Sequence, residues 1–102
     1  MIYVRGEMTK ADLIERVAAK QEGKVSKRML ERILDDVFDE IGIGLRRAPR
    51  FAYPGFGTFV RRRRRARRGW DPHAREKIVV PASVTVGFRP AKRLKDVVSR
   101  RL

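Results

Sequence analysis

Apolar residues recur at helical spacing near the start of the chain. The segment TKADLIERVAAK predicts a helix over residues 9–20, in which Thr9 followed by Asp12 forms a variant of the capping box. Gly23 interrupts the pattern, and Ser26 is a good N-cap for a second helix. The second helix carries an apolar stripe: Met29, Leu30, Ile33, Leu34, Val37, Phe38 and Ile41. The chain has few other elements to cover this stripe, which favours a homodimer in which a second copy completes the core.

The pattern then changes to that of β structure, and Gly42, Gly44 and Pro49 mark the change. Short strands are predicted in RFAY and GTFV on either side of a Pro54-Gly55 turn. The segment KIVVPASVTVGF is rich in β-branched residues and predicts a third strand, with an edge position or a bulge at Pro81. The final segment, RPAKRLKDVVSRRL, predicts a short helix with Pro90 in its first turn.

These elements predict an α+β fold of two helices, three antiparallel strands and a final helix, within one domain over residues 8–102. Residues 1–7 form an N-terminal extension in this interpretation. The second and third strands form a long hairpin, an arm over about residues 60–83, in which residues 60–68 pair with residues 76–83. Because the outgoing leg is arginine on both sides, the arm cannot lie on a core and must project into solvent or onto a partner.

The charge of the chain is concentrated in its second part. The net charge is +14 over 102 residues. Residues 1–45 hold 8 Lys/Arg against 9 Asp/Glu, whereas residues 46–102 hold 18 against 3. Such asymmetry indicates a polyanionic partner. A membrane-surface helix would need its basic residues opposite an apolar face, but the arginines of RRRRRARR at 61–68 run consecutively, so nucleic acid is favoured over lipid.

Composition argues against several other classes of protein. No stretch is long enough to cross a membrane, and residues 1–7 lack the apolar middle of a signal peptide, so a cytoplasmic protein is expected. The absence of cysteine excludes disulfides and thiolate metal sites. His73 is the only histidine, and no nucleophile–base pair or metal constellation can be assembled. We therefore expect no enzyme activity, no cofactor or metal and no small-molecule substrate.

The arginine block is predicted to contact phosphates along a groove of a nucleic acid, since the guanidinium fork hydrogen-bonds phosphate oxygens and stays charged. In a strand, neighbouring side chains point to opposite faces. One face would hold Arg61, Arg63, Arg65 and Arg67, and the other Arg62, Arg64 and Arg68. We expect one set to line the groove and the other to reach flanking phosphates.

Five motifs in order resemble the HU/IHF family of bacterial histone-like proteins. They are DLIERVA in the first helix, Ser26-Lys27, GFGTF at 55–59, Gly69 with Pro72, and LKD at 94–96. The likeness spans residues 8 to about 101. GFGTF is closer to HU and FRP at 88–90 is closer to integration host factor, so both branches stay open.

The resemblance implies an intertwined dimer with two β-ribbon arms that wrap double-stranded DNA along its minor groove in the nucleoid, so that the groove expected for the arginine block is the DNA minor groove. Pro72 matches the proline at the arm tip that wedges between base pairs and bends the duplex. The family pattern Arg-Asn-Pro is here Trp70-Asp71-Pro72, and Arg75 stands where the family has glycine. We expect Asp71 to cap the turn through its side chain. Trp70 either packs flat on the arm, which we favour, or stacks on a sugar or base.

The candidate DNA-binding set extends beyond the arginine block and Pro72. Its further members are Trp70, Arg75 and Lys77 on the arm, Lys92, Arg93 and Lys95 on the last helix, and Lys27 and Arg28 on the second. The predicted dimer core is Leu30, Ile33, Leu34, Val37, Phe38, Ile41, Phe56 and Phe59. Three alternatives remain: a heterodimer with a paralogue, a protein that bridges DNA without bending it, and a basic RNA-binding protein.

Overall fold

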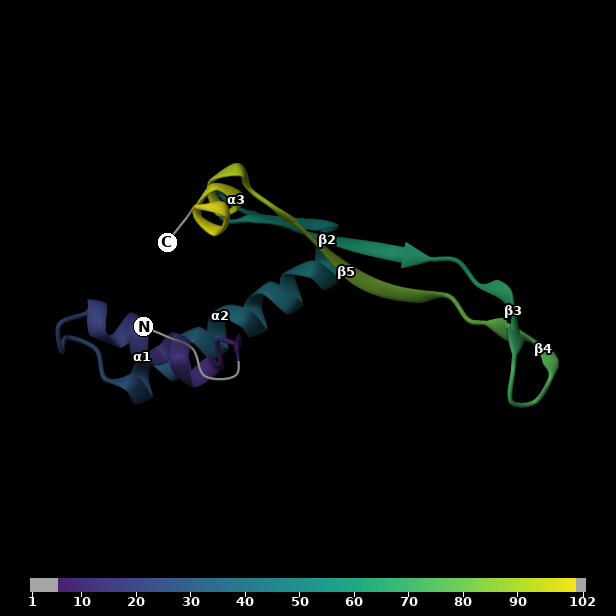
Figure 1. Cartoon of the computed structure of the whole chain (residues 1–102), viewed down its shortest axis with the longest axis horizontal. Coiled ribbons are helices and arrows are strands. Elements are labelled where there is room, and N and C mark those ends of the chain that lie inside the picture. The colour runs from purple at the N-terminus through teal and green to yellow at the C-terminus, as the bar shows by residue number, and fades with distance from the viewer. Residues whose placement is uncertain (1–5, 101–102) are drawn as a thin grey trace. The chain divides into compact units, whose positions relative to one another are not determined.

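The computed structural model describes residues 6–100, so most of the expected extension over residues 1–7 lies outside the described part of the chain. The chain divides into two units, Met1–Ile41 and Gly42–Leu102. The order of elements along the chain is two helices, five strands and a third helix, an α+β fold as the sequence predicted (Figure 1).

The first unit contains α1, Lys10–Lys20, and most of α2, Lys27–Arg47. The predicted capping box is present: the Thr9 backbone N–H donates to Asp12 Oδ2 at 2.9 Å, and the Asp12 N–H donates to Thr9 Oγ1 at 3.1 Å. Ser26 caps α2 by accepting a hydrogen bond from the Met29 N–H at 3.0 Å. Both helix starts are therefore fixed by contacts between residues three apart in the sequence.

The end of α2 corrects the sequence analysis, because the helix continues through Gly42 and Gly44 to Arg47. A glycine inside a helix costs only about 1 kcal/mol relative to alanine. That cost is offset by the burial of Leu45, which is 7% exposed. Pro49 is the residue that prevents the helix from continuing.

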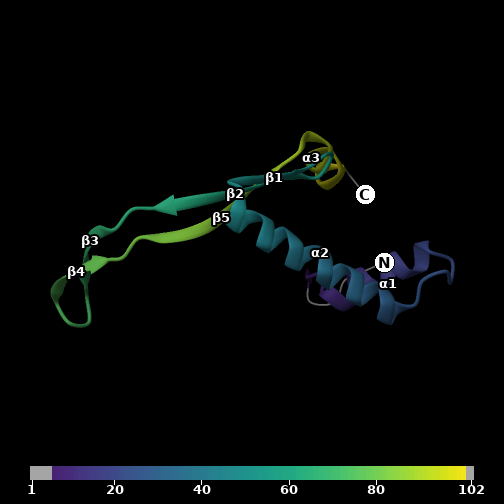
Figure 2. The same ribbon diagram turned by 180° about the vertical axis from the view of Figure 1, so that it is seen from behind.

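The second unit is built on a three-stranded antiparallel sheet in the order β1–β2–β5, comprising Arg50–Tyr53, Gly57–Arg64 and Ser83–Pro90. The Pro54-Gly55 turn forms as predicted, with Gly55 at φ +82° and the Phe56 N–H donating to the Tyr53 carbonyl at 3.0 Å. Figure 2 shows β1 beside β2 at the end of the sheet that lies near α3.

An aromatic cluster holds this sheet together. Phe88 lies 4.8 Å from Phe59 and 5.4 Å from Phe56, measured between ring centroids. Gly57 makes this packing possible, since a Cβ there would lie 2.6 Å from the Arg89 carbonyl oxygen and 2.6 Å from the Phe88 ring. The second glycine of the GFG motif is thus required by close packing.

Beyond the sheet, β2 and β5 continue into a second ribbon formed by β3, Arg67–Asp71, and β4, Glu76–Val80 (Figure 1). We call residues 61–86 the arm. The two legs pair as expected, but the register is shifted by about four residues: Val60 pairs with Gly87 and not with residue 83, and Arg68 pairs with Val79 and not with residue 76. The ladder is interrupted between the Arg64–Ser83 and Arg67–Val80 pairs, where each leg skips two residues. Pro81 lies in this gap and has no N–H to donate.

The final helix, α3, spans Lys92–Ser99, and Ala91 is its N-cap residue without a side-chain cap. Pro90 is the last residue of β5 and not part of the first helical turn, which corrects that expectation. The Ala91 N–H donates to the Phe56 carbonyl at 2.9 Å, so the start of α3 is attached to the turn that precedes β2.

Candidate nucleic-acid interface

The arm presents a dense row of exposed guanidinium groups. Strand pairing places Arg61 and Arg63 on one face of β2, and Arg62 and Arg64 on the other. The exposed members of the block are Arg62, Arg63, Arg64, Arg65, Arg67 and Arg68. In the described chain the three acidic residues of this unit, Asp71, Glu76 and Asp96, make no ion pair with these arginines. The surface of the arm is therefore suited to a polyanion.

The outgoing leg carries arginine on both faces, as the sequence predicted, but the return leg adds β-branched side chains to one of these faces. Val86 pairs with Arg61 and Val84 with Arg63, so these valines share a face with the two arginines. Farther out, a Cβ added at Gly69 would lie 3.2 Å from Val80 Cγ2 and 3.7 Å from Ile78 Cγ1, so these two side chains flank the glycine. The return leg therefore supplies β-branched side chains beside the arginines of the outgoing leg.

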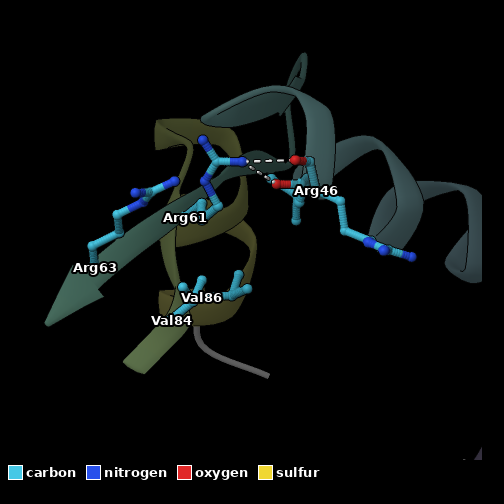
Figure 3. Close-up of a pocket in the computed structure, with 7 residues that line it drawn as sticks. Arg46, Arg61, Arg63, Val84 and Val86 are labelled. Carbon is cyan, nitrogen blue, oxygen red and sulfur yellow. Dashed lines mark hydrogen bonds between the residues drawn. The ribbon is translucent and has the colours of Figure 1, made fainter. Parts of the chain in front are cut away.

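Arg61 differs from the rest of the block because it is half-buried and makes hydrogen bonds inside the protein. Its Nη1 donates to the carbonyl oxygens of Leu45 at 3.0 Å and Arg46 at 2.9 Å (Figure 3). The sequence analysis placed Arg61 with the phosphate ligands, because a run of identical residues gives no signal that distinguishes one of them.

Gly87 provides room for the side chain of Arg62. A Cβ at Gly87 would lie 2.6 Å from Arg62 Cζ and 2.7 Å from its Nε. The Arg62 guanidinium thus lies over the glycine of the neighbouring strand, at the base of the arm. The sequence analysis missed this role of Gly87, although an isolated glycine within a β-branched strand is a recognised sign of a close approach.

The tip of the arm is an ordered turn. Asp71 Oδ1 accepts hydrogen bonds from the backbone N–H groups of His73 at 2.9 Å and Ala74 at 3.2 Å, which confirms the predicted side-chain cap. Arg75 occupies a left-handed conformation at φ 53°, where glycine would be less strained. Pro72 is exposed in this turn, two residues beyond Trp70, which is 57% exposed. The tip therefore presents a proline and an accessible indole on a braced loop.

The basic side chains on α2 and α3 are fewer and farther apart in the sequence than the arginines of the arm. Lys92 Nζ lies 3.0 Å from Asp96 Oδ2 within α3, and Arg93 lies 3.5 Å from the position that a Gly55 Cβ would occupy. Lys95 is exposed on the same helix. In the first unit Lys27 Nζ lies 3.1 Å from Glu15 Oε1, and Arg28 is exposed. Exposed ion pairs are weak, so a phosphate can compete for Lys27 and Lys92.

Most of the predicted dimer core is accessible in a single chain. Within residues 6–100 the buried apolar side chains are Ile14, Leu30 and Leu45. Ile33 and Val37 are each 45% exposed, and Phe38 is 59% exposed. Phe56 is exposed as well, while Leu34, Ile41 and Phe59 are half-buried.

Metal-ligating groups and membrane-spanning helices can be assessed for residues 6–100. No group of three His, Cys, Asp or Glu side chains among residues 6–100 is arranged to hold a metal ion. None of the described helices is long and apolar enough to cross a membrane. In the first unit the pKa of Lys10 is raised by a hydrogen bond to Asp35, whose Oδ1 lies 2.8 Å from Lys10 Nζ.

Comparison with known proteins points to one family. The family model described as bacterial DNA-binding protein matches residues 8–99. The chain is 43% identical over 94 residues to the SPbeta prophage-derived DNA-binding protein HU 2 of Bacillus subtilis, covering 92% of this chain and all of the relative. It is 40% identical over 91 residues to DNA-binding protein HU of Geobacillus stearothermophilus, covering 89% and 99%. A solved Anabaena HU–DNA cocrystal structure matches with a TM-score of 0.79 at 28% identity, over 92% of this chain and all of that one.

Proposed function

The chain belongs to the HU/IHF family of bacterial DNA-binding proteins, and from this premise we propose that it binds and bends double-stranded DNA as an architectural protein of the nucleoid, in the cytoplasm. The observation that carries the proposal is the arm, which combines six exposed arginines with an exposed proline at an ordered tip. Binding is largely independent of sequence, because phosphate contacts position a protein without reading bases. Residues 8–102 form the DNA-binding domain.

The binding unit is a homodimer. Ile33, Val37 and Phe38 leave much of their apolar surface in water in a single chain. Burying such surface contributes about 25 cal/mol per Å², and a second copy supplies a matching stripe. Because a symmetric dimer has two arms, it can hold one duplex at two places.

Affinity comes chiefly from the arms. The exposed arginines replace counterions along the phosphate backbone, and Arg75 and Lys77 add charge beside the tip. Val84 and Val86 share a face with Arg63. Their apolar side chains favour contact with the sugars that line the minor groove, which a charged side chain would not supply. Lys92 and Lys95 on α3 hold the flanks of the duplex.

Bending comes from the tip. The two hydrogen bonds to Asp71 hold the turn in one conformation before DNA binds. Pro72 can therefore enter a base step as a wedge without an entropic cost for ordering the turn. Trp70 is accessible enough to stack on a sugar or base beside the kink. Stacking of a base on an aromatic side chain contributes about 1–3 kcal/mol to the binding free energy in other proteins. This exposure favours stacking over the alternative in which the indole packs flat on the arm.

The proposal is tested by competition between duplexes of different flexibility. Unstacking a base step costs a few kcal/mol, and a nick removes much of that cost. We therefore expect nicked DNA to bind more tightly than an intact duplex of the same sequence in a fluorescence titration. Equal affinity for the two would contradict bending. A-form duplex RNA of the same length serves as the second competitor, and stronger binding to RNA would favour the RNA-binding alternative.

A further inference from the structure

We propose that Arg61 is a positioning residue that fastens the base of the arm to the C-terminal end of α2, and that it contributes no phosphate contact. The inference concerns the free protein, and only its consequence for DNA affinity rests on the proposed function. It separates one arginine from a block that otherwise looks uniform.

The Leu45 carbonyl near the end of α2 lacks the backbone donor that a continuing helix would supply. In an α-helix the Leu45 carbonyl would accept a hydrogen bond from the N–H of residue 49. That residue is Pro49, which has no N–H. Arg61 Nη1 supplies the missing donor at 3.0 Å and also reaches the Arg46 carbonyl at 2.9 Å. The side chain thus caps the helix end that Pro49 leaves open.

The positive charge of Arg61 lies at the C-terminal end of α2. The C-terminal end of a helix carries a partial negative charge, and a cation there is stabilising. The guanidinium of Arg61 lies at this end, whereas Figure 3 draws the Arg46 side chain pointing away from its own carbonyl and draws hydrogen bonds to Arg61 alone. Arg61 therefore neutralises the helix end on which it lies, and its charge is already engaged.

The main chain of Arg61 is also bound to the segment that follows α2. The Arg61 N–H donates to the Pro49 carbonyl at 2.8 Å. Arg61 is thus attached to the segment from Leu45 to Pro49 by its main chain and by its side chain. It is also the first residue of the arm, where a small change in strand direction is amplified along the ribbon toward Pro72.

Arg61 lies in a pocket beside the end of α2. Arg61 lines it with Leu45, Arg46, Val84 and Val86, and Arg61 as a residue is half-buried (Figure 3). Arg63, the next arginine on the same face, also lines the pocket but is exposed. The environment of the block therefore changes between these two residues, from half-buried at Arg61 to exposed at Arg63.

The test compares Arg61→Gln with Arg64→Gln, a matched substitution in the same strand at an exposed position. Trp70 is the only tryptophan and lies near the arm tip, so its fluorescence anisotropy decay in DNA-free protein reports motion of the arm. We expect Arg61→Gln to increase the fast component of that decay and Arg64→Gln to leave it unchanged. An unchanged decay in Arg61→Gln would overturn the inference.

Salt dependence of DNA binding gives the second readout. Each lost phosphate contact reduces the slope of log affinity against log salt by about 0.9, so Arg64→Gln changes the slope of a dimer by about 2. Arg61→Gln should instead give a line parallel to the wild type at lower affinity. An equal loss of slope in both variants would make Arg61 a phosphate ligand and refute the inference. A wild-type slope near zero would contradict the proposed function, while the anisotropy result would still decide the role of Arg61.

A conservative pair covers the possibility that Arg61→Gln does not fold, as judged by circular dichroism. Arg61→Lys keeps the charge but loses the guanidinium fork, so it should raise the fast component of the Trp70 decay above that of wild type. Arg64→Lys should not change it. Identical decays in Arg61→Lys and wild type would count against capping by the guanidinium.

Discussion

The apolar stripe on α2 and the arm are both exposed in a single chain, but they lack different partners. Phe38 is 59% exposed in the stripe, and its apolar surface can be covered by a second copy of the same stripe. Arg64 is exposed on the arm, and like-charged neighbours prevent a second arm from covering it. One region is thus completed by protein and the other by a polyanion, and a substitution in either should leave the other property intact.

The largest effect is expected from Phe38→Asp. A carboxylate in the middle of a buried apolar interface is unfavourable by several kcal/mol, so the dimer should dissociate. Sedimentation should then show a monomer, and the dependence of Tm on protein concentration should disappear. Arg32→Asp introduces the same side chain elsewhere on α2 and should remain dimeric. A dimeric Phe38→Asp would show that the stripe is not the interface.

The next effect is expected from Gly57→Ala at the start of the central strand, β2. The added Cβ would lie 2.6 Å from the Arg89 carbonyl oxygen, which belongs to the backbone and cannot move aside cheaply. We expect a loss of about 1–3 kcal/mol in the free energy of unfolding, measured with urea. DNA affinity per folded dimer should not change. A variant as stable as wild type would show that this packing is not required.

Pro72→Ala separates binding from bending. Because the phosphate contacts remain, affinity should change little, whereas the kink should be lost. Energy transfer between the ends of a short labelled duplex measures the bend, and circular dichroism confirms that the fold is intact. If the variant bends DNA as strongly as wild type, then Pro72 is not the wedge. A wild type that compacts DNA without bending it would instead support the bridging alternative.

The smallest effect is expected from Gly87→Ala. The three atoms nearest to a Cβ added at Gly87 all belong to the Arg62 side chain, the far end of which can move. We expect the free energy of unfolding to change by less than about 0.5 kcal/mol. The contrast with Gly57→Ala tests whether close approach to backbone, and not glycine itself, sets the cost. A loss as large as that of Gly57→Ala would show that the Arg62 side chain is held rigidly.

The features that the sequence predicted well depend on residues close together in the chain. The Thr9 capping box, the Ser26 cap and the Asp71 turn each join residues two or three positions apart, and all three are present. The apolar stripe was predictable for a similar reason, since it depends on helical periodicity. DNA binding was predictable from the charge asymmetry, and the resemblance to the family supplied the place of Pro72.

The features that could not be predicted depend on residues far apart in the chain. The register of the arm is set by the pairing of β2 with β5 in the sheet, which no alternation in an arginine run reveals. The role of Arg61 requires Pro49 and the end of α2, a position that the glycines of the helix obscured. Identical residues in one block therefore acquire different functions through their tertiary neighbours.

The most direct test of the central claim is the salt dependence of wild-type binding to a short duplex. With about 8–10 phosphate contacts for a pair of arms, the slope of log affinity against log salt should lie near −7 to −9. This range follows from two arms that follow the phosphate backbone of one duplex. A slope near −2 would contradict the account, because it would leave most of the exposed arginines without contact to DNA.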